Sequence, residues 1–133
     1  MNRGAASTSK LEPAAVFKGP TVDELRRVIG VEGFQDLLRV FLTESRNDLD
    51  ALRRALAEDR EIDAAFYAHR MKGASAAIGA EAVQYLATAA EALGRVGRAD
   101  IVRQLVPDLE AAVEQVRVAS GPPRPSSWPG LRR

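Results

Sequence analysis

The placement of proline limits the fold of this chain more than any other feature. Prolines occur at positions 13, 20, 107, 122, 123, 125 and 129, so residues 21–106 contain none. A proline inside a helix removes one backbone hydrogen bond and clashes with the preceding turn, and its absence therefore leaves room for long helices. No run in this stretch alternates apolar and polar residues with period two, as a half-buried strand would. We therefore predict an all-α domain.

Apolar residues at spacings of three and four predict five helices. The segment Thr21–Glu24 matches a capping box that begins the first helix, and Gly30 is expected to end it. The apolar face of this short helix would consist of Val22, Leu25, Val28 and Ile29. The other helices are expected at about 32–58, 61–78, 81–95 and 100–119. Pro107 predicts a kink or a late start in the last of them.

The short connections between these segments would make neighbouring helices antiparallel. The predicted architecture is therefore an up-down-up-down four-helix bundle with a short extra N-terminal helix. Residues 1–16 are small and polar, and residues 120–133 are rich in proline. We expect flexible segments there, at the two ends of a helical domain that spans 17–119.

Charge and composition exclude several classes of function. With 19 basic and 18 acidic residues the net charge is +1, which argues against a nucleic-acid or membrane surface and favours a protein partner. The chain has no cysteine and one histidine, which excludes disulfides and makes a metal site improbable. No stretch approaches the roughly 20 apolar residues of a membrane span. We expect a cytoplasmic monomer, and the richness in alanine and arginine fits a GC-rich bacterial genome.

The single histidine, His69, lies in the helix expected at 61–78. The inward face of this helix is predicted to consist of Ala64, Ala68, Met71, Ser75 and Ile78. Because each residue advances a helix by about 100°, His69 would be turned away from the core. Lys72 at i+3 and Gly73 at i+4 would share its face. The sequence therefore places an exposed imidazole beside a cation and a patch of bare backbone.

The rest of this face is mostly apolar and suits the docking of another protein. Its candidate docking residues are Ile62, Ala65, Phe66 and Ala76. Ile62 and Phe66 could equally be core residues. Gly73 could simply permit close helix crossing, and Lys72 alone would more often be a surface charge.

The segment 68–80, AHRMKGASAAIGA, resembles the signature of histidine phosphotransfer (HPt) domains, which reads His-x-hydrophobic-Lys-Gly-small-small followed by Gly-Ala. The resemblance extends over about 21–119. It implies that His69 accepts the phosphoryl group, that Lys72 is the cation on the phosphate side, and that Gly73 gives a partner access. Met71 stands where leucine is usual, a change that conserves volume. Ala74 replaces a common serine.

The resemblance implies a phosphocarrier without an ATP site of its own. Such a protein takes a phosphoryl group from the aspartate of a response-regulator receiver domain or a hybrid histidine kinase and passes it to another receiver. No Walker-type loop, Rossmann fingerprint or kinase motif occurs in the sequence. No carboxylate cluster accompanies His69, so no cofactor is expected and Mg²⁺ would belong to the partner receiver. The alternative is a helical adaptor or inhibitor that binds a receiver or kinase without carrying phosphate, and a plain structural bundle comes third.

Overall fold

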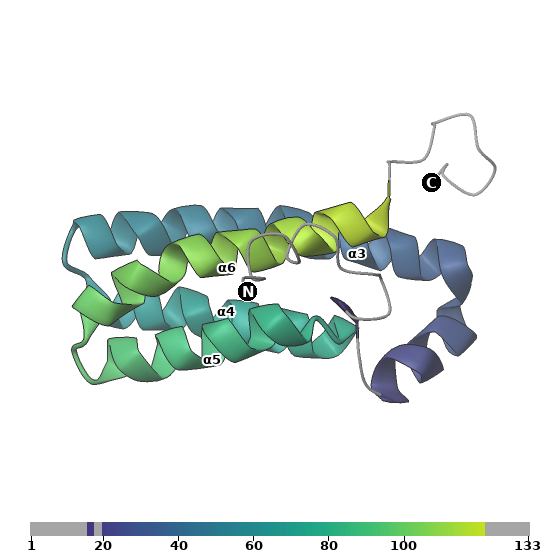
Figure 1. The fold of residues 1–133 in the computed structure, drawn as a ribbon, viewed down its shortest axis with the longest axis horizontal. Helices are drawn as coiled ribbons and strands as arrows, with labels where there is room; N and C mark the ends of the chain where they lie inside the picture. The colour runs from purple at the N-terminus through teal and green to yellow at the C-terminus, as the bar shows by residue number, and fades with distance from the viewer. Residues whose placement is uncertain (1–15, 18–19, 122–133) are drawn as a thin grey trace, which may run out of the picture.

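The computed structural model describes residues 16–17 and 20–121, and this part of the chain contains four helices and no strand. The helices are α3 (Pro20–Ala57), α4 (Glu61–Ile78), α5 (Glu81–Arg95) and α6 (Ala99–Ser120) (Figure 1). The predicted all-α class is therefore confirmed. The two segments that we expected to be flexible lie almost entirely outside the described residues.

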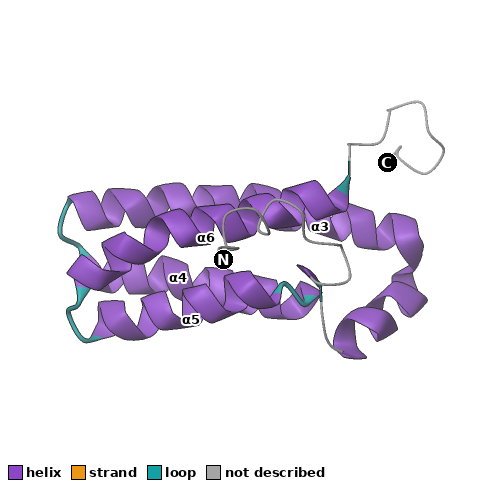
Figure 2. Cartoon of the chain, viewed as in Figure 1, coloured by secondary structure: helices purple, strands orange, loops and turns teal. Residues whose placement is uncertain are grey.

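The four helices form a ring in which α3 contacts α4 and α6, and α5 contacts the same two helices. The α3–α4 and α5–α6 turns lie at one end of the bundle, and the α4–α5 turn lies at the other (Figure 2). Gly79 ends α4 in the left-handed conformation, with φ 75°, which glycine adopts without steric cost. The N–H of Ala80 then donates to the carbonyl of Ser75 at 2.9 Å. This tight turn connects α4 to α5, and the two helices contact each other.

Helix α3 is bent at Gly30, whose φ of 78° and ψ of 174° are not helical. As expected, Gly30 interrupts the helix, and α3 comprises the two helical segments on either side of this bend. The first segment extends past the ends of α4 and α5 (Figure 1). Its predicted apolar face is only partly correct, because Val22 is buried whereas Val28 and Ile29 are exposed.

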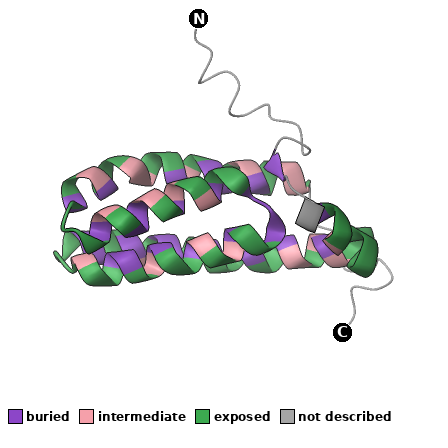
Figure 3. Cartoon of the chain, turned by 90° about the horizontal axis from the view of Figure 1, so that it is seen from below, coloured by how far each residue is buried: buried purple, intermediate pink, exposed green. Residues whose placement is uncertain are grey.

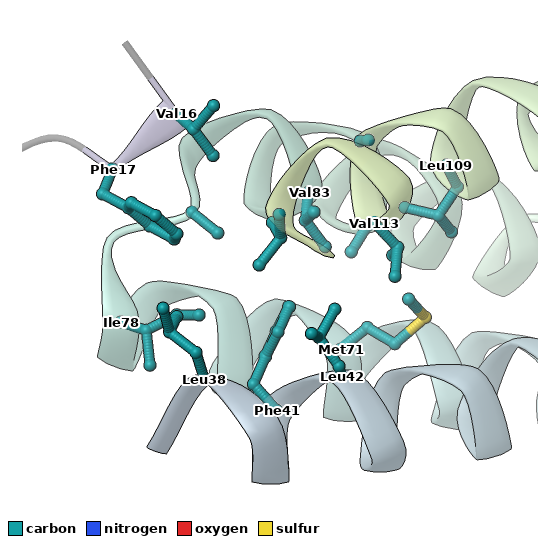
Figure 4. Close-up of a cluster of buried hydrophobic side chains, with 14 of the residues drawn as sticks. Val16, Phe17, Leu38, Phe41, Leu42, Met71, Ile78, Val83, Leu109 and Val113 are labelled. Carbon is teal, nitrogen blue, oxygen red and sulfur yellow. The ribbon is translucent and has the colours of Figure 1, made fainter. Parts of the chain in front are cut away.

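Buried residues recur along all four helices (Figure 3). The larger of two apolar clusters includes Met71, Leu42 and Leu109 (Figure 4). Val16 and Phe17 also belong to it, and the Phe17 ring packs edge-to-face on Phe34 with centroids 5.6 Å apart. Val16, predicted to lie in the flexible segment 1–16, is thus a core residue.

The smaller cluster is rich in alanine, and its buried members are Leu52, Ala55, Leu56, Ala64, Ala68, Ala90, Ala99 and Val102. Small side chains allow α3, α4 and α5 to approach closely here. Helix α6 begins at Ala99 and continues through Pro107, which excludes the late start. No helix in the described part of the chain is long and apolar enough to cross a membrane.

Candidate functional site

Helix α4 directs His69 out of the bundle. Its predicted inward residues, Ala64, Ala68, Met71, Ser75 and Ile78, are all buried. The His69 side chain is 57% exposed, as the helical spacing predicted. The buried Ala68 immediately before it faces the alanine-rich cluster and fixes the backbone beneath the ring. The imidazole therefore stands on a rigid helix with solvent access.

The structure resolves the alternative readings of three neighbouring positions. Ile62 is 66% exposed and Phe66 is 53% exposed, so neither is a core residue. A Cβ added to Gly73 would meet nothing within 4 Å. Gly73 therefore does not mediate close helix crossing, and it leaves open space one turn from His69. Ala76 is also exposed on this face.

Ala65 is a correction to the predicted docking surface. It is only 1% exposed and faces α5, where a Cβ added to Gly94 would lie 3.2 Å from the Ala65 Cβ. The inward face of α4 is wider than the predicted stripe because α5 packs against its flank as well. Ala65 therefore holds α4 against α5 and cannot touch a partner.

Glu91 of α5 is the main feature of the site that the sequence analysis missed. Its carboxylate Oε2 lies 3.0 Å from Nδ1 of His69, and its Oε1 lies 2.8 Å from Nζ of Lys72. Arg95 donates to Oε2 as well, from Nη2 at 2.8 Å and from Nε at 3.1 Å. The Glu91 side chain is only 10% exposed. One nearly buried carboxylate thus joins three nitrogen-bearing side chains.

The sequence carried a signal for Glu91. Val83, Ala87 and Gly94 are buried on one face of α5, and Glu91 lies on the same face at i+4 from Ala87. An acidic residue within an apolar stripe requires a partner, because burying an unpaired carboxylate is costly. Arg95, at i+4 from Glu91, supplies one such partner.

The surrounding cations lower the pKa of Glu91 to about 2, with Lys72 as the largest cause and Arg95 next. The carboxylate is therefore ionised at neutral pH and can only accept hydrogen bonds. Consequently the proton of a neutral imidazole belongs on Nδ1, which donates to Glu91. The lone pair is then on Nε2, the nitrogen that can act as a nucleophile.

The other cation of the motif, Arg70, serves a different helix. Its Nε donates to Oδ1 of Asp48 on α3 at 3.0 Å, and its Nη2 lies 3.4 Å from Oε1 of Glu44. Burial is the largest influence on Asp48 and raises its pKa, while Arg70 opposes that effect. The two cations that follow His69 in sequence, Arg70 and Lys72, therefore bind carboxylates on two different helices, α3 and α5.

The bundle thus presents an imidazole that is more than half exposed and whose Nδ1 contacts a nearly buried carboxylate. A model of the Hpt domain family matches residues 36–119, which is more than half of the chain. The protein belongs to the Hpt domain family, as its motif indicated. Hpt domains transfer phosphoryl groups through histidine in two-component systems, where they interact with receiver domains and histidine kinases. No curated protein and no solved structure matches the chain.

Proposed function

We propose that this chain carries phosphoryl groups in a two-component phosphorelay, accepting them on Nε2 of His69 from a receiver aspartate and returning them to another receiver. The observation that supports this proposal is the contact between Nδ1 of His69 and Glu91, in a ring that is 57% exposed. A histidine that only served as a surface residue would not need a buried carboxylate to fix its tautomer.

The transfer requires little beyond this arrangement. The Nε2 lone pair attacks the phosphorus of an aspartyl phosphate in line, the N–P bond forms, and the P–O bond to the aspartate breaks. The aspartate leaves as a carboxylate with the electron pair. The ring gains positive charge while its proton remains on Nδ1, and the ionised Glu91 stabilises that charge. The reverse step returns the phosphoryl group to a second aspartate.

The exposed face around His69 is the proposed docking surface for the receiver. It consists of Ile62, Phe66, Gly73 and Ala76, with Lys72 as the cation that meets the phosphoryl oxygens. Two exposed apolar side chains, Ile62 and Phe66, lie beside a glycine that has no side chain. Together they provide a flat apolar surface against which a second protein can pack. Mg²⁺ would be bound by the receiver. We place this exchange in the cytoplasm and propose that the chain acts as a monomer.

The proposal includes the topology of the domain, which we infer to be up-down-up-down over residues 17–119. Asp48 and Arg70 lie at similar chain distances from the α3–α4 turn, and their ion pair is the contact expected of antiparallel neighbours. His69 and Glu91 are related in the same way across the α4–α5 turn. The part of α3 before Gly30 would be the additional N-terminal helix.

The test is phosphoryl transfer from a receiver domain that has been charged with acetyl phosphate and Mg²⁺. Wild-type protein should acquire phosphate that is labile to acid and stable to base. Because the chain contains one histidine, any phosphohistidine in this protein is at His69. Absence of this phosphate across the receivers of the source genome would refute the proposal.

The variant His69→Gln separates the carrier from the adaptor or inhibitor. In the proposed function it abolishes transfer and leaves receiver binding nearly unchanged, since only the ring is lost. An adaptor would keep its full effect on the receiver or kinase after this substitution. Arg117→Gln, a change on α6 in a residue paired with Glu114, is the control for loss of surface charge.

A further inference from the structure

In the unphosphorylated (resting) protein, two cations bind the single negative charge of Glu91, although one cation would balance it. Lys72 binds Oε1 of Glu91 at 2.8 Å, and Arg95 binds Oε2 through two nitrogens at 2.8 Å and 3.1 Å. Each cation alone would balance the charge of Glu91. Lys72 lies on the same helix face as His69, whereas Arg95 is on α5, in the last turn.

Phosphorylation of Nε2 adds a second negatively charged group to the site, and this group also requires a cation. The phosphoryl oxygens bring negative charge to the face that carries Lys72, one turn from the ring. Lys72 has a flexible stem and is 34% exposed, so it can turn from Glu91 to these oxygens. Oε1 of a nearly buried carboxylate would then lose its partner, and an unpaired buried charge is strongly destabilising.

We propose that Arg95 is a positioning residue that keeps the carboxylate of Glu91 directed at Nδ1 of His69 while Lys72 moves to the phosphoryl group. This inference rests on the proposed phosphocarrier function. Arg95 acts through Glu91 and does not bind phosphate. Its two donors converge on Oε2, the oxygen that also accepts from His69, so they hold the atom that fixes the ring.

A purely structural role for Arg95 makes different predictions. A cation in the last turn of a helix interacts favourably with the helix dipole. That effect would be equal in the resting and phosphorylated states. The positioning role acts mainly in the phosphorylated state, because in the resting state Lys72 alone can hold Glu91. The two roles are therefore distinguished by comparing the two states.

The experiment measures the equilibrium constant for transfer from one phosphorylated receiver to His69. Arg95→Gln should lower it about tenfold, the size of effect expected of an outer partner of a reactive group. Arg95→Lys should restore most of the loss because the positive charge returns. Arg117→Gln removes a similarly exposed arginine that is also paired within its own helix, and it should have no effect.

Two further measurements test whether Arg95 acts through Glu91. In a Glu91→Gln background, Arg95→Gln should cause no further loss, whereas an arginine that contacted the receiver would still cause one. In the resting protein, ¹⁵N NMR of the imidazole should show the proton on Nδ1 for Arg95→Gln and for Lys72→Ala. It should show a mixture of tautomers for the double variant.

The possible failures are distinct. Wild-type protein that accepts no phosphate would overturn the proposed function and this inference with it. Wild-type protein that accepts phosphate while Arg95→Gln behaves like Arg117→Gln would overturn the inference alone. So would an unchanged Nδ1 tautomer in the double variant, because neither cation would then be needed to hold Glu91. Far-UV circular dichroism of each variant verifies that the helices are intact.

Discussion

Ala65 and Gly94 set the distance between α4 and α5, since a Cβ added at position 94 would lie 3.2 Å from the Ala65 Cβ. Ala65 is one helical turn before His69, and Gly94 is one turn after Glu91. The close contact between the two small residues therefore adjoins the contact between the ring and the carboxylate. The geometry of the site depends on how closely these helices pack.

Gly94→Val should consequently lower the free energy of unfolding by about 1–3 kcal/mol, because the branched side chain has no space against α4. The same substitution should lengthen the distance from His69 to Glu91 and weaken phosphoryl transfer. Urea denaturation measures the first effect. A variant as stable as wild type would show that α4 and α5 can separate at this point without cost.

Gly73, on the outer face of α4, differs from Gly94 because an added side chain there has open space. Nothing lies within 4 Å of the added Cβ, so the variant Gly73→Ala should gain about 0.5–1 kcal/mol of stability from the better helix propensity of alanine. Transfer should nevertheless fall, because the methyl group occupies the space where we propose that the receiver approaches His69. Thermal unfolding and transfer rate are measured on the same preparation. A stabilised variant with wild-type transfer would remove the proposed role of Gly73 in access.

The sequence was sufficient for features that depend on one helix at a time. The exposure of His69 and the burial of Ala68 and Met71 follow from the 3.6-residue period alone. Gly30 was correctly identified as a break, because its non-helical backbone is a local property. The Hpt motif is also local, and the family match confirms it.

Features that depend on two helices could not be obtained in this way. The partnership of Glu91 with His69 requires the register of α5 against α4, which is set by the tight turn at Gly79 and the contact between Ala65 and Gly94. The 3.6-residue helical period alone also did not predict that Ala65 faces α5. Likewise, Val28 is 77% exposed although its spacing places it on the apolar face predicted for the first segment.

Glu91→Gln tests the role of the carboxylate in the reaction. The amide retains the shape of the side chain but carries no charge, so it cannot stabilise the positive charge that the ring acquires on phosphorylation. Transfer should slow by about 10–100-fold. The imidazole should also lose its single tautomer, which ¹⁵N NMR detects directly. Transfer at the wild-type rate would show that Glu91 does not assist the ring.

The same variant predicts a specific dependence of stability on pH. The pKa of Glu91 is lowered from 4.5 to about 2 in the folded protein, so ionisation of Glu91 stabilises the fold above pH 4.5, and this stabilisation is lost as the pH falls toward 2. Because Lys72 and Arg95 are partly exposed and solvent screens their charges, this shift corresponds to at most about 3 kcal/mol. Glu91→Gln should therefore be less stable than wild type at pH 7 and equal to it near pH 2. A difference in stability that did not change with pH would contradict this origin.

Ionisation of Asp48, which contacts α4 from α3, should have the opposite effect on stability to ionisation of Glu91. The Asp48 side chain is 9% exposed, and burial raises its pKa above the ordinary 3.8 despite the Arg70 contact. A raised pKa means that the ionised form is disfavoured by folding, so the penalty is present at neutral pH and disappears as the pH falls below 3.8. Asp48→Asn removes this penalty, and its amide oxygen can still accept from Arg70.

We therefore expect Asp48→Asn to equal or exceed wild type in stability at pH 7, by up to about 1 kcal/mol, and to have no advantage near pH 3. The control is Asp50→Asn on the same helix, where the side chain is 63% exposed and paired with Arg53. Because exposed pairs contribute little, this control should change stability by less than about 1 kcal/mol at either pH. Urea denaturation from pH 3 to 7 provides the measurement. A large loss of stability in Asp48→Asn at pH 7 would mean that the ion pair with Arg70 outweighs the cost of burying the carboxylate.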